Sequence, residues 1–140
     1  MKIVYISPEN VGAAWPMFKD YAHNVFPMTK KRRTPAKFLK DLMDDRESLM
    51  LVQDNDGSIV GFMTTSVSEY DDTKMLQVRM LSGDRFDEWI DMAQNTLDQI
   101  AMDNDCDGME LIGRRGWIRK LARLGWEEAY VTAEKRFAHV

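Results

Sequence analysis

The stretch SIVGFMTTSVSEYDDTKMLQVRMLSGDRFDEWI, residues 58–90, decides the fold class. Its first part, Ile59 to Val67, is rich in the β-branched and aromatic residues that favour strands. Turn-forming residues at Tyr70 to Thr73 separate it from Lys74 to Leu81, where polar and apolar residues alternate as in a half-buried strand. From Phe86 to Ala101, apolar residues recur at steps of three and four, which predicts a long amphipathic helix. Two antiparallel strands followed by a helix are therefore expected.

Toward the N-terminus, the sequence predicts two strands and two helices. Lys2 to Ser7 has the pattern of a short strand, and a helix is expected to begin at Pro16, because proline is disfavoured inside a helix. Thr34 precedes a proline and has the features of a helix N-cap, so a second short helix should follow it. Ser48 to Val52 is an apolar strand pattern, and Asp54 to Gly57 is a strong turn signal that makes a hairpin with the next strand.

Toward the C-terminus, three more elements are expected. Met109 to Ile112 has the composition of a buried strand, Trp117 to Leu124 of a short helix closed by Gly125, and Ala129 to Phe137 of a last strand. The order is then β-α-α-β-β-β-α-β-α-β. It predicts an α/β (α+β) class protein with one domain over residues 1–140 and a mixed, mostly antiparallel sheet flanked by helices.

Composition limits the classes of function. With 44% hydrophobic and 30% charged residues the chain should fold as a globular protein, and it has no run of apolar residues long enough for a signal peptide core or a membrane span. A cytoplasmic location is expected. Cys106 is the single cysteine and stands among acids that disfavour a reactive thiolate, and the two histidines, His23 and His139, have no ligand spacing, so no metal is expected.

Two runs of basic residues stand out against a net charge of −4. One is Lys30 to Arg33, and the other lies within residues 114–123. The second run contains Arg115, Arg119 and Arg123 at four-residue steps with Lys120 beside them, which predicts a basic stripe on one helix face. Such a stripe is either a solvated surface or a site for phosphates, a nucleic acid or an acidic protein.

Taken together, these elements resemble the GNAT fold of acyl-CoA-dependent N-acetyltransferases over nearly the whole chain. SIVGFMTTSV (residues 58–67) is similar to the family's third strand, and WIRKLARLGWEEAYV (residues 117–131) to its fourth helix and last strand. LSGDRFDEWI and IRKLARLGW also resemble the small GNAT-like proteins of tailed bacteriophages, some of which are internal virion proteins. This narrower resemblance implies a phage or prophage origin and a location in the host cytoplasm or the virion.

The resemblance implies an acetyl-CoA site between the fourth strand and the long helix. The family's loop reads Arg/Gln-x-x-Gly-x-Gly/Ala, and here Arg79 takes the first place while Ser82 and Asp84 take the two glycine positions. The loop is degenerate, and Asp84 has a competing interpretation as the N-cap of the helix. The implied cofactor-binding residues are Leu81, Ser82, Gly83, Asp84, Arg85 and Phe86.

Catalytic residues are expected from the same resemblance. Leu121 takes the position of the family's tyrosine acid, so Tyr130 is the expected substitute. Glu69 is the expected base, with Asp71 and His23 as alternatives. Two functions follow: an acetyl-CoA-dependent N-acetyltransferase, intact or degenerate, that acts on a small-molecule or protein amine, or a catalytically inactive binding or virion-associated protein. The second would bind an acidic protein or nucleic acid through Arg115, Arg119, Lys120 and Arg123.

Overall fold

The computed structural model describes residues 1–139; Val140, the last residue of the expected domain, lies outside the described part. Within residues 1–139 five strands form a sheet in the order β1-β2-β3-β4-β5, where β4 and β5 are parallel and all other neighbours are antiparallel. The strands are β1 (Lys2–Ile6), β2 (Ser48–Gln53), β3 (Ile59–Glu69), β4 (Lys74–Gly83) and β5 (Gly108–Leu111). The mixed, mostly antiparallel sheet is as predicted.

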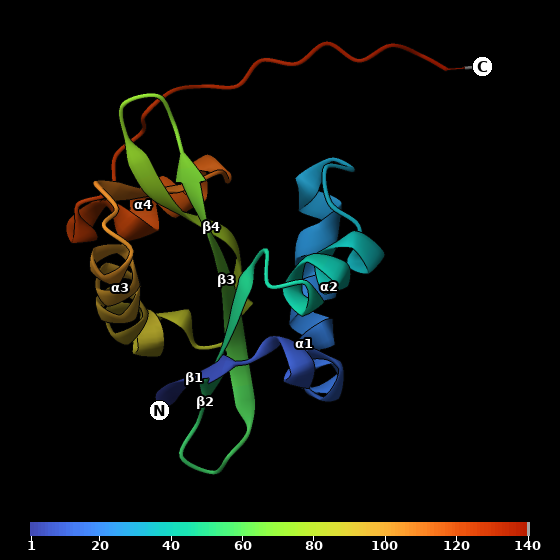
Figure 1. Ribbon diagram of the computed structural model, residues 1–140, viewed down its shortest axis with the longest axis vertical. Coiled ribbons are helices and arrows are strands. Elements are labelled where there is room, and N and C mark those ends of the chain that lie inside the picture. Colours follow the sequence, from blue (N-terminus) through green and yellow to red (C-terminus); the bar gives the residue numbers. More distant parts are fainter. Residues whose placement is uncertain (140) are drawn as a thin grey trace.

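Helices cover both faces of this sheet (Figure 1). One face is covered by α1 (Val11–Val25) and α2 (Pro35–Met43), and the other by α3 (Phe86–Asp103) and α4 (Arg115–Leu121). Short 3₁₀ turns η1 (Pro8–Asn10), η2 (Phe26–Thr29) and η3 (Ala122–Leu124) flank α1 and α4. Among the helices of residues 1–139, none has the length and hydropathy needed to cross a membrane.

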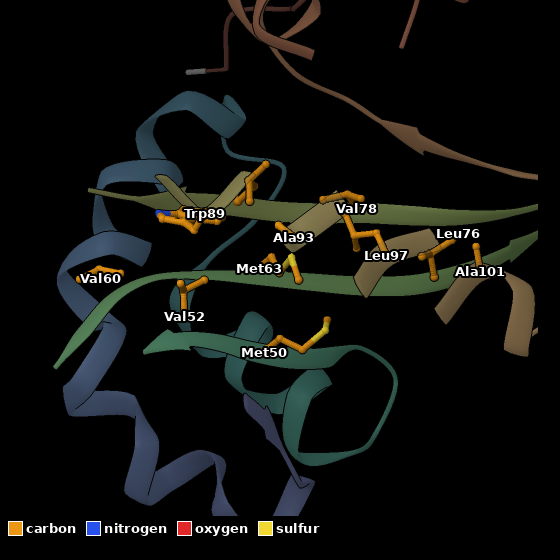
Figure 2. Packing of buried hydrophobic residues seen from close by; sticks show 11 residues of the cluster. Met50, Val52, Val60, Met63, Leu76, Val78, Trp89, Ala93, Leu97 and Ala101 are labelled. Carbon is orange, nitrogen blue, oxygen red and sulfur yellow. The ribbon is translucent and has the colours of Figure 1, made fainter. Parts of the chain in front are cut away.

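Each face of the sheet has its own hydrophobic core. Under α3, the buried Trp89, Ala93 and Leu97 pack on strand residues such as Met63 and Val78 (Figure 2). Under α1 and α2, the core is built from aromatic rings, of which Phe18, Phe38 and Phe62 are fully buried. Trp89 is also fully buried, so α3 is fixed to the sheet close to its N-terminus.

The starts of α1 and α2 can be compared with the sequence-based predictions. The Thr34 hydroxyl accepts a hydrogen bond from the Lys37 N–H at 3.3 Å, which confirms the predicted N-cap of α2. The prediction that the first helix begins at Pro16 is wrong, because α1 begins at Val11 and contains Pro16. Proline in this position lacks the N–H that would bond to the Gly12 carbonyl, and the burial of Val11 and Ala14 compensates for that loss.

A β-bulge in β4 breaks the predicted alternation of that strand. Thr64 of β3 pairs with Met80, but the next residue, Thr65, pairs with Val78, so Arg79 is an extra residue without a cross-strand partner in β3. Because of this insertion Val78 faces the core under α3, whereas Met80 faces the core under α1 and α2. The regular alternation expected for this strand predicts that Val78 and Met80 lie on the same face of the sheet.

The predicted last strand, Ala129 to Phe137, is wrong: this segment is extended but pairs with none of the described strands. The chain is held at both ends of the segment. The Trp126 indole N–H donates to Gln94 Oε1 at 2.7 Å, which fastens the chain to α3. Further on, Glu134 accepts a hydrogen bond from Arg32, in the loop before α2. Between these points the segment runs past the tip of the β3–β4 hairpin, away from β5 (Figure 1).

Candidate functional site

The candidate site lies where β4 and β5 separate. β5 pairs with β4 only from Met75 to Val78, so Arg79–Gly83 extend past the end of β5 and lead directly into α3. We call this divergence of β4 from β5, along Arg79–Gly83, the fork. Ligands in α/β proteins bind outside the carboxyl ends of parallel strands, at the point where the connections diverge, and the fork has this position.

A buried ion cluster supports the bulge at the mouth of the fork. The Glu47 side chain is almost fully buried and accepts hydrogen bonds from the Arg33 guanidinium at 3.0 and 2.5 Å. Arg79 approaches the same carboxylate, with 3.7 Å between Arg79 Nε and Glu47 Oε1. Two guanidinium groups share one carboxylate, so a positive charge remains beside the bulge. No local pattern predicts this cluster, because its three residues are far apart in the sequence.

Gly83 is required for packing rather than for loop flexibility. It lies opposite Gly61 of β3, and a Cβ atom at Gly83 would lie 2.4 Å from the Val60 carbonyl oxygen and 2.5 Å from Gly61 Cα. The neighbouring cofactor-loop candidates also belong to the sheet: Leu81 is buried and pairs with Met63, and Ser82 pairs with Phe62. The end of β4 is therefore held tightly against β3.

Asp84 is engaged through three of its polar groups. Its N–H donates to the Val60 carbonyl oxygen at 2.7 Å, its carbonyl oxygen accepts from the Trp89 indole at 2.8 Å, and its carboxylate accepts from the Tyr21 hydroxyl at 3.0 Å. Burial and this hydrogen bond to the Asp84 carboxylate raise the pKa of Tyr21. The alternative that Asp84 caps α3 is wrong by one residue, since Arg85 takes that position with a left-handed φ of 56°.

The start of α3 is surrounded by both signs of charge. Arg85 forms ion pairs with Asp54 and Glu88, each at 2.5 Å, and the hydrogen bonds to Glu88 and Asp54 hold the pKa of Arg85 above its usual value. Asp87 and Glu88 lie in the first helical turn. Phe86 is half-buried and lies against the Trp117 ring with 5.1 Å between centroids, so α4 packs on the start of α3.

The predicted basic stripe is only partly formed. α4 ends at Leu121, and Arg123 lies in the 3₁₀ turn that follows, where it pairs with Asp91 of α3 at 2.9 Å. Arg115 lies 3.8 Å from Glu128, and Arg119 is exposed. The Lys120 ammonium is 5.6 Å from the ring centroids of both Phe86 and Trp117, which places it beside the start of α3.

The expected catalytic residues do not lie at the fork. Glu69 pairs with Lys74 at the hairpin tip, and Lys74 is about 17 Å along β4 from the bulge at Arg79. Tyr130 is exposed and lies near Tyr70, whose pKa is raised by the hydrogen bond to Glu110, burial and, more weakly, by Tyr130.

The remaining catalytic candidates have structural explanations. Leu121, at the family's tyrosine position, is buried in the core. His23, on α1, lies between the rings of Trp15 and Phe26, whose centroids are 5.6 and 6.0 Å away. Asp71 lies in the exposed hairpin turn. In residues 1–139, no three His, Cys, Asp or Glu side chains gather as metal ligands would. None of the expected catalytic acids and bases therefore lies at the fork.

The fold is that of known acetyltransferases. No protein-family model and no curated protein matches the sequence. Among solved structures, a probable acetyltransferase is similar with a TM-score of 0.72 at 16% identity, covering 100% of this chain and 99% of the other. A ribosomal-protein-alanine N-acetyltransferase from Brucella melitensis biovar Abortus 2308 gives 0.71 at 15%, covering 98% and 100%. An aminoglycoside acetyltransferase from an uncultured soil metagenomic sample gives 0.70 at 13%, covering 98% of each chain.

These similarities extend over whole chains on both sides, so the protein has the GNAT fold, with a mixed five-stranded sheet between two layers of helices. At such low identity they show the fold and leave the activity to be argued from the site.

Proposed function

We propose that the protein is an acyl-CoA-dependent N-acetyltransferase whose acyl donor binds in the fork. The observation that supports this proposal is the separation of β4 from β5 beyond Val78, immediately before the start of α3. Along Arg79–Gly83 the edge of β4 that faced β5 has no strand partner among residues 1–139. Its backbone N–H and C=O groups are available to a chain-like ligand that contains amides, as the pantetheine arm of CoA does.

Acetyl-CoA bound at the fork would need a changed set of phosphate contacts. The usual cradle is occupied, because the Asp84 N–H bonds to Val60 and the glycine at position 83 packs on Gly61. The proposed phosphate ligands are two cations of α4. Lys120 lies beside the start of α3, and Arg119 is exposed. When bound, acetyl-CoA supplies an activated acetyl group for transfer to an amine.

The chain's own residues would position the donor and shield it. The bulge at Arg79 presents a backbone segment that is unpaired with β3, at the point where the thioester end of a ligand along β4 would arrive. The Phe86–Trp117 contact forms an apolar wall at the start of α3, which excludes water from that side. The amine acceptor would be a small molecule or a protein. Glu69 and Tyr130 lie away from the fork, so neither would accept the proton that the amine loses.

A second function is favoured by the carboxylates at the start of α3. Asp84, Asp87 and Glu88 all stand where an active member would bind a pyrophosphate, and like charges there oppose CoA binding. A GNAT-fold protein that has lost catalysis and binds an acidic protein or a nucleic acid through Arg115, Arg119 and Lys120 would tolerate them. The resemblance to phage-borne and virion-associated proteins stays a prediction under either function.

Isothermal titration calorimetry together with thermal unfolding in acetyl-CoA tests the proposal, since a ligand that binds only the native state must raise its thermal stability. We expect saturable binding that is weakened in Lys120→Gln and unchanged in Lys31→Gln, a matched lysine in the other basic run. Release of free CoA thiol in the presence of an amine panel then establishes transfer. No binding at millimolar acetyl-CoA would reject the acetyltransferase proposal.

The second function makes a different prediction. Charge reversal of Arg115 and Arg119 to Glu should abolish capture of the acidic partner or nucleic acid while the thermal unfolding midpoint stays unchanged, because both side chains are exposed. Capture that persists in the double variant would exclude α4 as the docking surface.

A further inference from the structure

Arg79 lies beside a carboxylate, but its guanidinium donates no hydrogen bond within residues 1–139. Its Nε is 3.7 Å from Glu47 Oε1, which is too long for a hydrogen bond, and 35% of the Arg79 side chain is exposed. A guanidinium group holds its N–H donors in a rigid plane, and this geometry matches that of a carboxylate. The donors of Arg79 are therefore available to a ligand.

Glu47 cannot neutralise both of the arginines beside it. Arg33 donates to both oxygens of this buried carboxylate, at 3.0 and 2.5 Å. The Arg33 guanidinium also lies over the Phe38 ring of α2, with 5.2 Å between its central carbon and the ring centroid, and this contact helps to hold Arg33 on Glu47. One positive charge is then left at Arg79, where the side chain is only partly exposed to solvent.

Two other carboxylates on this side of the molecule are already paired. Asp41 of α2 pairs with Lys37 at 2.5 Å, and Glu134 of the C-terminal segment pairs with Arg32 at 2.5 Å. Neither of them offsets the charge at Arg79. The pair between Glu134 and Arg32 shows in addition that the loop before α2 binds a carboxylate of the protein's own chain.

The charge at Arg79 lies across the sheet from the cations proposed for the CoA phosphates. Phe38, which lies under Arg33, belongs to the core beneath α1 and α2. Lys120 lies on α4, which together with α3 covers the opposite face (Figure 1). A donor whose phosphates bind at Lys120 does not account for Arg79, so this arginine is available to the second substrate.

We propose that Arg79 binds an acid group of the acceptor, so that the acceptor is an amine that also carries a carboxylate. That this ligand is the acceptor rests on the proposed function, in which the thioester end of the donor arrives at the bulge formed by the same residue. A two-point contact between guanidinium and carboxylate would orient the amine toward the thioester. The same charge repels an amine that has no acid group, because such an amine is a cation at neutral pH.

Calorimetric titration with matched ligands tests the acid group. β-Alanine, γ-aminobutyrate and ε-aminocaproate are each compared with the corresponding amide, which keeps the amine and removes the negative charge. The protein is titrated with and without millimolar CoA, which has no acetyl group to transfer. We expect at least one acid to bind about tenfold or more tightly than its amide, as for a hydrogen bond to a charged group. Equal affinity for acid and amide throughout the series would overturn the inference.

Two peptides separate the sources of such an acid. The amidated tripeptide Ala-Glu-Ala is compared with Ala-Gln-Ala in the same titration. A preference for the first peptide that exceeds the preference among the free amino acids would assign the acid group to a peptide acceptor. A preference seen only among the amino acids would assign it to a small molecule.

Variants of Arg79 identify the residue that binds the acid. Arg79→Gln should abolish the preference for the acid, and Arg79→Lys, which keeps the charge without the planar donors, should retain only part of it. Arg46→Gln is the matched control, because Arg46 is exposed, precedes Glu47 in the sequence and carries the same charge. This control should keep the full preference. The ratio of the two affinities does not depend on the folded fraction, so a loss of stability alone would not change it. An acid preference that survives in Arg79→Gln would contradict the assignment.

Failure of this inference and failure of the proposed function give different results. If the acetyl group is transferred to acids and amides with equal kcat/KM, the acetyltransferase proposal holds and the acid site is overturned. If acetyl-CoA does not bind at millimolar concentration while the acid preference persists, the acetyltransferase proposal fails and Arg79 still binds an acid. Spermidine, which is a polycation, should be a poor acceptor, and a kcat/KM above that of every acid would contradict an excess of positive charge at the site.

Discussion

Replacing Gly83 by alanine separates a packing role for this glycine from a role in phosphate binding. The added Cβ would lie 2.4 Å from the Val60 carbonyl oxygen and 2.5 Å from Gly61 Cα, about 1 Å closer than ordinary van der Waals contact. Both neighbours are backbone atoms, so no rotamer change relieves the contact, and β3 and β4 must move apart. That movement also strains the hydrogen bond from the Asp84 N–H to Val60.

We expect Gly83→Ala to lower the free energy of unfolding by about 3 kcal/mol, the upper end of overpacking costs, and the melting temperature by roughly 10 °C. Urea and thermal unfolding followed by circular dichroism measure both. Gly116→Ala is the matched control, because nothing lies within 4 Å of its added Cβ and it lies in α4, where alanine is neutral or stabilising by up to about 1 kcal/mol. An unfolding free energy of Gly83→Ala within about 0.5 kcal/mol of the wild type would refute the packing argument.

Three further predictions concern the residues around the fork. Arg33→Ala removes both of its hydrogen bonds to the buried Glu47, so the free energy of unfolding should fall by about 3 kcal/mol in urea titrations, and a loss under about 1 kcal/mol would be inconsistent with a buried ion pair. Burial and Asp84 raise the pKa of Tyr21 above 10.0, so the stability from this shift is complete below that pH and is lost as pH rises through the folded-state pKa. The difference in phenolate absorbance between the wild type and Tyr21→Phe should titrate above the range of free tyrosine, and titration within that range would contradict the contact with Asp84. Lys120→Gln should raise the dissociation constant of acetyl-CoA about fivefold in calorimetry, and an unchanged constant would remove Lys120 from the phosphate contacts.

Local patterns were sufficient for most of the fold. The turn at Asp54 to Gly57 and the apolar periodicity of α3 depend on residues close in sequence, and both predictions are confirmed. The last strand could not be predicted correctly in the same way, because residues 129–137 have the composition of a strand but have no strand partner among residues 1–139. The composition of a segment indicates that it favours a strand conformation, but it does not identify the strand with which the segment pairs.

The contacts around the candidate site could not be predicted from the sequence. The resemblance of Arg79 to Asp84 to the family's cofactor loop predicts a site at the end of β4, which is also where the fork lies. The contacts that occupy Asp84 come from Tyr21 on α1 and Val60 on β3, and no spacing in the sequence relates these residues to position 84. The cluster around Glu47 is equally long-range. Glu69 lies at the tip of the β3–β4 hairpin and Tyr130 lies near Tyr70 of the same hairpin, so both are separated from the fork.

The extra residue in β4 also has an evolutionary consequence. A strand paired on both sides cannot gain one residue without disturbing two neighbours, but at Arg79 only β3 must adapt, because β5 has already ended. The fork is thus a place where an ancestral insertion or deletion would have been tolerated. Homologues that lack this residue would carry Ser82 and Gly83 one step out of register, so their loop residues should be aligned by superposition rather than by hydrophobic alternation.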